Sequence, residues 1–187
     1  MPSKNTFAVD VADIRKRARA HLEKGAITEN YGGDPDNAVE LLNSALATEI
    51  VCVLRYTMHA VCATGIASEG PKGEFEQHAK EEREHANMIA ERINQLGGTP
   101  NFNPEGLSSR ATSQFGPEKP NLVEMIKENL VAERIAIEHY RDLVRYFAEK
   151  DPSTRRMLEY ILSQEEEHAN DMHDLLVAHE GTPFLKK

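Results

Sequence analysis

The chain has 187 residues, enough for one domain of ordinary size with a substantial core. Hydrophobic residues make up 40% of it and charged residues 28%, as in soluble globular proteins, and no uninterrupted run approaches the roughly 18 apolar residues of a membrane span. The net charge of −9 argues against general affinity for nucleic acid through the folded surface. No apolar signal-peptide core follows the first residues, so we expect a cytoplasmic protein that does not bind a membrane.

The N-terminal part of the chain predicts one short helix. Residues 8–24 carry Val9, Val11 and Ile14 among charges, which is a weakly amphipathic pattern. Gly25 is suited to end this helix, and residues 30–35 read as a loop because they contain two glycines and a proline. We therefore expect residues 1–35 to form an extension that carries a short helix.

Four long helices are predicted in the rest of the chain. A Gly70-Pro71 break separates the first helix from the second, and Ser153 or Thr154 can cap the fourth. Their apolar residues recur at helical spacing in the segments at about 36–67, 73–96, 121–148 and from Ser153 to about 180, where Gly181-Thr182-Pro183 stops the pattern.

The links between these helices predict how they pack. Short links join the first helix to the second and the third to the fourth, so each pair should be antiparallel. Residues 98–119 hold several prolines and glycines and show no period, which fits a long crossover between the second and third helices. The predicted fold is all-α: an antiparallel four-helix bundle over residues 36–180, followed by a short tail at 181–187.

Six ionisable residues fall on the apolar stripes of these helices: Glu49, Glu82, His85, Glu133, Glu165 and His168. An uncompensated buried charge costs several kcal/mol, so stability alone does not explain this pattern. Two divalent cations would cancel four carboxylate charges, and neutral imidazoles would complete the coordination without adding charge. The stripes therefore predict a site for two metal ions between the helices.

The spacing of the six residues supports this prediction. Glu82-x-x-His85 and Glu165-x-x-His168 are i, i+3 pairs, so each presents a carboxylate beside an imidazole. One such pair is usually a solvated face, whereas two hairpins with the same layout are not expected by chance. We expect each pair to hold one metal as terminal ligands, with Glu49 and Glu133 as terminal or bridging ligands. Carboxylates and imidazoles suit iron or manganese, and zinc can substitute.

Four segments resemble bacterioferritins and their mini-ferritin relatives, within roughly residues 37–178: LLNSALATEIVCVLRY (41–56), EQHAKEEREHANMIAERINQLGGTPNFN (76–103), NLVAERIAIEHY (129–140) and ILSQEEEHAND (161–171). The resemblance implies a ferritin-like fold in which the six residues are the ligands of a ferroxidase di-iron site, with Tyr56 packed nearby. It further implies two iron ions per subunit, oxidation of Fe(II) by dioxygen or hydrogen peroxide, and a role in iron storage or detoxification.

Two departures from the bacterioferritin pattern change what we expect. Bacterioferritins bind haem through a methionine directly after the first glutamate of the second helix, and Arg83 stands there, so no haem is predicted. Cages of 24 subunits carry a short fifth helix, for which residues 181–187 are too few. The resemblance therefore implies a 12-subunit shell or a dimer rather than a 24-subunit cage.

Two alternative functions stay open. A manganese catalase or a di-iron peroxidase could use the same ligands, although the chain has no Cys-x-x-Cys pair for a rubredoxin domain. A shell that protects DNA could use the basic segment Arg15-Lys16-Arg17-Ala18-Arg19, but such a segment is more often a solvated face or a subunit contact, so nucleic acid is not the expected partner.

The remaining candidate side chains are interpreted as structural. Cys52 and Cys62 are expected to be buried thiols in a reducing compartment, with Cys52, one turn from Glu49, as a less favoured redox partner. His78 and Glu81 are candidates for an outer contact or an access path to the metals. Otherwise, surface or core-edge positions are expected for five of the six histidines outside the metal pair: His59, His78, His139, His173 and His179.

Overall fold

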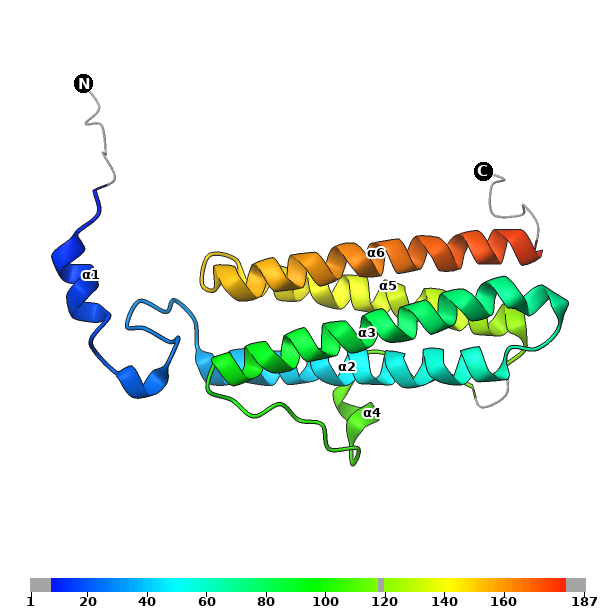
Figure 1. Cartoon of the computed structure of the whole chain (residues 1–187), viewed down its shortest axis with the longest axis horizontal. Helices are drawn as coiled ribbons and strands as arrows, with labels where there is room; N and C mark the ends of the chain where they lie inside the picture. The colour runs from blue at the N-terminus through cyan, green and yellow to red at the C-terminus, as the bar shows by residue number, and fades with distance from the viewer. Residues whose placement is uncertain (1–7, 118–119, 181–187) are drawn as a thin grey trace, which may run out of the picture.

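The computed structural model describes residues 8–117 and 120–180, and four long helices dominate it (Figure 1). α2 and α6 run in one direction, whereas α3 and α5 run in the opposite direction. α2 packs along α3 and α5 along α6, so the molecule consists of two antiparallel hairpins joined by a crossover. The predicted all-α four-helix bundle is confirmed, with α2 (Pro35–Cys62), α3 (Glu69–Gln95), α5 (Leu122–Phe147) and α6 (Pro152–Glu180).

The N-terminal segment projects from one end of the bundle (Figure 1). Its helix α1 (Val11–Arg17) begins after Asp10, whose carboxylate accepts a hydrogen bond from the backbone N–H of Asp13, and none of its residues is buried. A 3-10 turn, η1 (Leu22–Lys24), follows. The expected helix over 8–24 is therefore wrong in length, because His21 adopts a left-handed backbone conformation (φ 52°) that interrupts it.

The link between α2 and α3 lies earlier in the chain than expected. α2 ends at Cys62, where Ala63 turns to an extended conformation, and the 3-10 turn η2 (Ile66–Ser68) leads into α3. Gly70 and Pro71 do not break the chain but lie in the first turn of α3. Proline is tolerated there because a first-turn N–H has no partner within the helix.

Side-chain caps define the starts of α5 and α6. Asn121 and Glu124 form a capping box at α5, each side chain accepting the other residue's backbone N–H. Asp151, rather than the expected Ser153 or Thr154, caps α6 by accepting from the backbone N–H of Thr154. The predicted stop at 181–183 and the tail at 181–187 lie outside the described residues.

The crossover between α3 and α5 runs along α2 and contains one short helix, α4 (Leu107–Arg110). Hydrogen bonds from α2 hold it in place, since the Ser44 hydroxyl donates to the carbonyl of Arg110 and the Thr48 hydroxyl lies 3.0 Å from that of Thr112. The crossover thus covers one side of α2 over the middle of the bundle.

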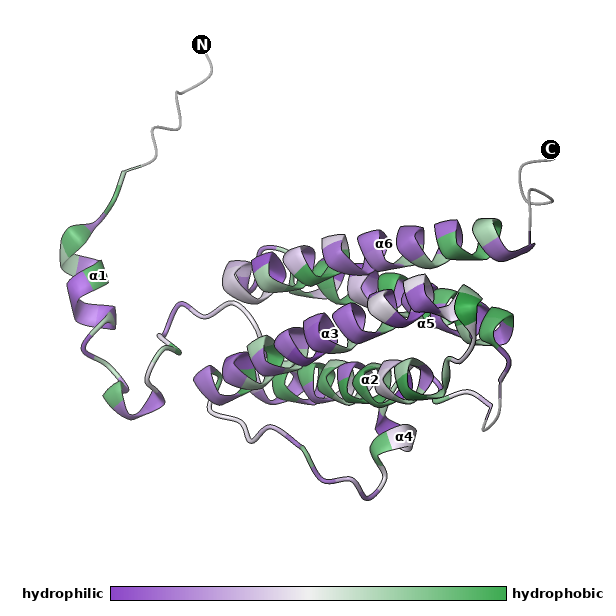
Figure 2. Cartoon of the chain, turned by 45° about the vertical axis from the view of Figure 1, so that its right-hand side comes forward, coloured by the Kyte–Doolittle hydropathy of each residue, from purple (hydrophilic) through white to green (hydrophobic). Residues whose placement is uncertain are grey.

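The apolar core consists of two separate clusters. One is centred on Leu46, Ile93 and Ile161, and the other on Phe75 and Met172. α2 lies in the core: by length and composition it is the one described helix apolar enough to cross a membrane, and 56% of its most apolar stretch is buried inside the bundle. Figure 2 shows that α2 is more hydrophobic than the outward faces of its neighbours: α2 is largely green, whereas the outward faces of α3 and α6 are purple.

Candidate metal centre

The space between the two apolar clusters holds the six residues singled out from the sequence. Each has at most 2% of its surface exposed, although all are ionisable. Every long helix contributes: Glu49 from α2, Glu82 and His85 from α3, Glu133 from α5, and Glu165 and His168 from α6. The bundle is therefore divided across its middle by one buried polar layer.

The six side chains form two overlapping groups whose ligand atoms lie within 4.8 Å of one another. One group is Glu49, Glu82, His85 and Glu165; the other is Glu82, Glu133, Glu165 and His168. Glu82 and Glu165 belong to both groups, which is the position of a carboxylate that bridges two ions. This sharing favours Glu82 and Glu165 over Glu49 and Glu133 as the bridging pair, and we call Glu49 and Glu133, which belong to one group each, the terminal glutamates.

Unpaired buried atoms test whether these residues fit metal ions. Among the described residues, twelve buried side-chain nitrogen or oxygen atoms have no hydrogen-bond partner, and eight of them belong to this layer. Glu82 and Glu165 each leave both oxygens unpaired, Glu49 and Glu133 each leave Oε2, and His85 and His168 each leave Nδ1. Buried polar atoms are normally paired, so this concentration fits cations as the missing partners.

Two tyrosines account for the other oxygens of the terminal glutamates. The Tyr140 hydroxyl donates to Glu49 Oε1 and the Tyr56 hydroxyl donates to Glu133 Oε1. Both tyrosines are fully buried. The two halves of the centre thus repeat the same arrangement, one tyrosine and one terminal glutamate on each side.

The two histidines face the glutamates through Nδ1. His85 Nδ1 lies 3.0 Å from Glu165 Oε1 and 3.3 Å from Glu49 Oε2. His168 Nδ1 lies 3.2 Å from Glu82 Oε1, while its Nε2 lies 2.9 Å from Glu81 Oε2. The Glu81 carboxylate can fix the orientation of the His168 ring, as carboxylates behind metal-bound histidines do.

The electrostatics of the layer show how protons are shared when no metal is bound. Burial and then the charge of Glu82 raise the pKa of Glu49 to about 8. Burial likewise raises the pKa of Glu165 well above its usual value. Burial also acts to raise the pKa of Glu82, but the imidazoles of His168 and His85, which lie 3.2 and 3.6 Å from its oxygens, outweigh burial and lower that pKa. Divalent cations can replace the protons that this cluster otherwise retains.

A second buried polar cluster beside the centre was not singled out from the sequence. Arg55 is 1% exposed; its Nε donates to Asn129 Oδ1 at 3.1 Å, and its Nη2 lies 3.4 Å from Cys52 Sγ. His59, expected near the surface, is fully buried with Nδ1 3.1 Å from Asn129 Oδ1. The sequence signal for this cluster is a lone polar residue on each apolar stripe, which has no distinctive spacing.

The two cysteines differ in environment. Cys52 is 1% exposed, as expected, and burial raises the pKa of its thiol well above the usual value. Cys62 is exposed, so the expectation of a buried thiol is wrong there. It lies at the last residue of α2, where the helix leaves the core.

His78 lies in the layer around the centre rather than at the surface. It is 1% exposed, its Nδ1 is 3.1 Å from the Tyr56 hydroxyl oxygen, and its ring stacks on His168 with 4.0 Å between the ring centroids. The core-edge expectation is therefore wrong for His78. Its position matches the alternative of an outer contact to the metal-facing residues.

Comparisons with known proteins show similarity to a family model and to two relatives. A model of the ferritin-like domain matches residues 39–180. The chain is 32% identical over 162 residues to the DNA protection during starvation protein of Pyrococcus furiosus, covering 86% of this chain and 88% of that protein. It is 31% identical over 134 residues to the nutrient stress-induced DNA-binding protein of a Synechococcus species, covering 70% and 75%.

Solved structures show the same likeness. A dodecameric thioferritin, the bacterioferritin-related protein from Bacteroides fragilis, is 34% identical with a TM-score of 0.76, covering 83% of this chain and 94% of that chain. Dps from Thermosynechococcus elongatus has a TM-score of 0.74 at 18% identity, covering 81% and 96%, which is a likeness of fold alone.

Proposed function

The chain belongs to the family of ferritin-like proteins, and from this premise we propose that it oxidises Fe(II) to Fe(III) at the centre between its four helices. The observation that carries the proposal is the set of eight unpaired buried ligand atoms, arranged among the described residues as two groups that share Glu82 and Glu165. Paired iron sites in bundles of this class are built from the same types of residue.

The proposed reaction uses two Fe(II) ions as substrate. Each ion gives up one electron, and one oxidant accepts the pair: hydrogen peroxide with two protons becomes two water molecules, or dioxygen with two protons becomes hydrogen peroxide. Glu82 and Glu165 hold the ions next to each other, while Glu49 with His85 and Glu133 with His168 complete the two sites. Hard carboxylate oxygens stabilise the Fe(III) product more than the Fe(II) substrate, which favours oxidation.

An aerobic Fe(II) titration of the metal-free protein tests this proposal. We expect oxidation well above the rate in buffer, and a fall to that rate in Glu82→Gln and Glu165→Gln. Glu84→Gln is the matched control, because Glu84 lies on the same helix with 63% of its side chain exposed. Oxidation by the wild type no faster than in buffer would refute the proposal, and peroxide disproportionation with bound manganese would favour the catalase alternative.

The number of ferric ions retained per subunit separates storage from oxidation alone. A count that stops at about two, the capacity of the paired groups, indicates an oxidase without a mineral store. A count far above that value indicates a shell that holds mineral.

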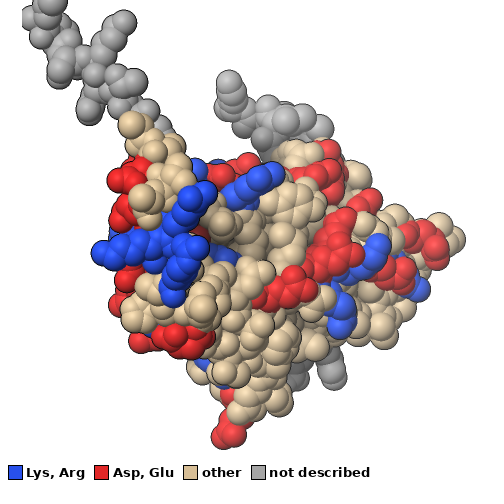
Figure 3. All heavy atoms as spheres, turned by 60° about the vertical axis from the view of Figure 1, so that its left-hand side comes forward, with Lys and Arg blue, Asp and Glu red and all other residues tan. Residues whose placement is uncertain are grey.

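A second candidate function is DNA protection, which the relatives favour over storage in a bacterioferritin-like cage. Both curated relatives carry names that refer to DNA, and the similar thioferritin is dodecameric. In this chain Arg15, Lys16 and Arg17 form the last turn of α1, which has no buried residue. Figure 3 shows Lys and Arg side chains gathered at this end of the molecule, so the surface carries a local basic patch although the net charge of the chain is negative.

DNA retention in a gel at physiological salt tests this second function. We expect binding that weakens with added salt and is lost when Arg15, Lys16, Arg17 and Arg19 are all replaced by alanine. Equal replacement of Lys72, Lys80, Arg83 and Arg145, which lie on the bundle surface, changes the net charge by the same amount and should leave binding in place. Loss of binding in both variants, or in neither, would contradict a role for α1.

A further inference from the structure

A cavity of about 270 Å³ adjoins the candidate centre between α3 and α6. Among the residues that line it are four carboxylates and two imidazoles: Glu74, His78, Glu81, Glu167, His168 and Asp171. His168 belongs both to this lining and to the metal centre. At the outer end, 45% of the Glu74 side chain and 40% of the Asp171 side chain are exposed, so the cavity connects the bundle surface with the centre.

The hydrogen bonds of His78 determine where its lone pair points. The single proton of the Tyr56 hydroxyl is donated to Glu133. His78 Nδ1 lies 3.1 Å from the same hydroxyl oxygen, so Nδ1 must carry a proton and donate it. In the neutral ring the lone pair is then on Nε2, on the opposite side of the imidazole.

His78 Nε2 faces two carboxylates and, among the described residues, has no hydrogen-bond donor. It lies 3.5 Å from Asp171 Oδ2 and 3.9 Å from Glu74 Oε2. Ligands about 2.1 Å from a shared tetrahedral ion are about 3.4 Å apart, so these separations suit three ligands of one cation. A ring that is 1% exposed and directs an acceptor at two further acceptors favours a cation between them.

We propose that His78, Asp171 and Glu74 form a third site for a divalent cation, separate from the paired centre, which captures Fe(II) at the bundle surface and passes it inward. The identity of the cation rests on the proposed function. A second set of ligand atoms, from His78, Glu81 and His168, also lies within 4.8 Å and leads from this site to the centre. His78 belongs to both sets, so a captured ion has a continuous row of ligands along the cavity.

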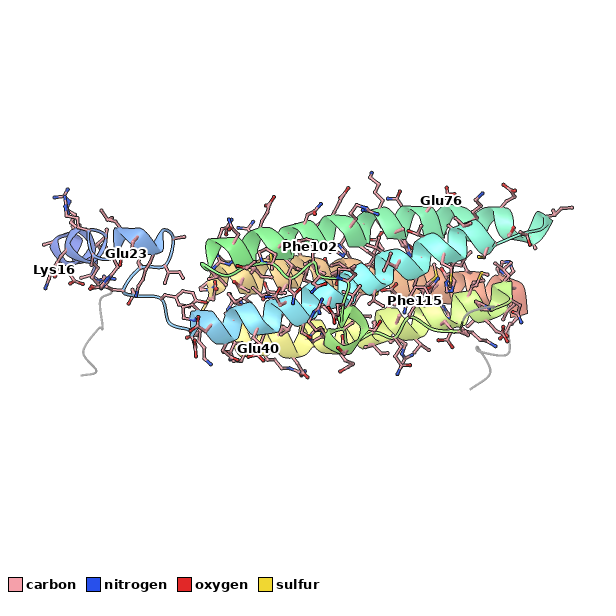
Figure 4. All side chains as sticks on the ribbon, turned by 90° about the horizontal axis from the view of Figure 1, so that it is seen from below. Lys16, Glu23, Glu40, Glu76, Phe102 and Phe115 are labelled. Atoms are coloured by element: carbon pink, nitrogen blue, oxygen red, sulfur yellow. The ribbon has the colours of Figure 1, made fainter. Side chains whose placement is uncertain are left out.

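Crystals of the metal-free protein soaked in Co(II) test for the site, because anomalous scattering locates each ion. We expect a peak between His78 and Asp171 in addition to the peaks of the paired centre. Glu74→Gln with Asp171→Asn should remove the outer peak and keep the central ones. The control, Glu76→Gln with Glu84→Gln, removes two charges from exposed positions of α3 and should keep every peak; Figure 4 shows Glu76 directed away from the bundle.

Absence of the outer peak in the wild type, or its persistence in the Glu74/Asp171 variant, overturns the third site. The first result would mean that a proton on His78, rather than a metal, balances the two carboxylates. An outer peak beside an empty centre supports the third site while refuting the proposed function, so the two failures are distinguishable.

Fe(II) oxidation kinetics test the transfer step. In the Glu74/Asp171 variant we expect the Fe(II) concentration that gives half the maximal rate to rise about tenfold, the lower range of losses seen when outer contacts of a metal site are removed. The Glu76/Glu84 control should show no such rise. The same half-maximal Fe(II) concentration in the Glu74/Asp171 variant and in the Glu76/Glu84 control overturns the transfer role.

Discussion

Two tyrosine hydroxyls determine which oxygen of each terminal glutamate has no hydrogen-bond partner and would be available to a metal ion. Tyr140 occupies Oε1 of Glu49 and Tyr56 occupies Oε1 of Glu133, so only Oε2 of each remains unpaired among the described atoms. Burial and then the neighbouring glutamates raise the pKa of both phenols well above the usual value. The hydroxyls therefore stay protonated and act as permanent donors.

Tyr140→Phe should weaken the metal centre while keeping the fold. Glu49 Oε1 would lose its donor in a fully buried site, which costs about 1–3 kcal/mol of stability. Because the glutamate would no longer be held in one orientation, Co(II) affinity should fall about 10–100-fold. Calorimetric titration measures the affinity, with Tyr160→Phe as control because Tyr160 is 51% exposed. Unchanged affinity would show that the hydroxyl does not orient Glu49.

The raised pKa values of two residues in the centre predict how the stability of the metal-free protein depends on pH. The folded pKa of Glu49 is raised to about 8 by burial and the charge of Glu82. Burial acts to lower the pKa of His168, but the Glu82 carboxylate, whose Oε1 lies 3.2 Å from Nδ1, outweighs this and raises the pKa to about 9. Both groups bind protons more tightly in the folded protein than in the unfolded chain. The contribution of these two groups to the free energy of unfolding is thus complete at low pH and is lost as pH rises through their pKa values in the folded protein.

The unfolding temperature of metal-free protein should therefore fall between about pH 5 and pH 9, and Co(II) should raise it most at the high end, where cations no longer compete with protons. Scanning calorimetry with and without Co(II) measures this difference. Glu49→Gln removes one of the titrating groups and should flatten the slope of the metal-free protein. A metal-free stability that rises across this range would contradict the assigned directions.

At the scale of helices, the sequence allowed the bundle and the convergence of the six residues to be predicted. The apolar stripes place Glu49 and Glu133 on the inner faces of their helices, and the structure does bring all six side chains together. The stripes did not predict which glutamates are shared. Spacing along one helix fixes the face of a side chain but not its rotation relative to three other helices, so Glu82 and Glu165 could not be recognised as the central pair.

Other details depended on interactions that the periodicity does not contain. Proline in the first turn of α3 is compatible with a helix, so Gly70-Pro71 did not mark its start. His59 and His78 are buried because Asn129 and Tyr56, from other parts of the chain, supply their hydrogen-bond partners. A lone histidine on a stripe gives no sign of such a partner, which is why both were expected near the surface.

Asp151 joins the two hairpins and should be important for stability. It is 3% exposed, accepts from Thr154 at the start of α6, and accepts from Arg92 Nη2 of α3 at 2.9 Å. Asp151→Ala removes a helix cap and the carboxylate partner of the partly buried Arg92, so we expect a loss of about 2–4 kcal/mol in urea unfolding. Asp142→Ala, with 77% of its side chain exposed, should change stability by less than about 0.5 kcal/mol. Equal losses would contradict this role.

At the scale of the whole molecule, charge is unevenly distributed. The chain carries a net charge of −9, yet its N-terminal segment presents a run of basic residues on α1, a helix with no buried residue that projects from the end of the bundle. Figure 4 shows Lys16 on this segment, beyond the end of the long helices. A projecting basic helix can contact either a nucleic acid or a neighbouring subunit, and these two roles have different consequences for assembly.

The mass of the assembled protein distinguishes them. A 12-subunit shell, as in the similar thioferritin, would have a mass of about 250 kDa, twelve times the 21.0 kDa of the chain. If α1 binds DNA, replacing Arg15, Lys16, Arg17 and Arg19 by alanine should leave this mass unchanged in sedimentation equilibrium while DNA retention is lost. If the segment instead joins subunits, the same variant should dissociate to smaller species, and loss of DNA retention would then reflect loss of the shell. Sedimentation of the wild type as a dimer would refute the shell itself and would limit the protein to oxidation without a mineral store.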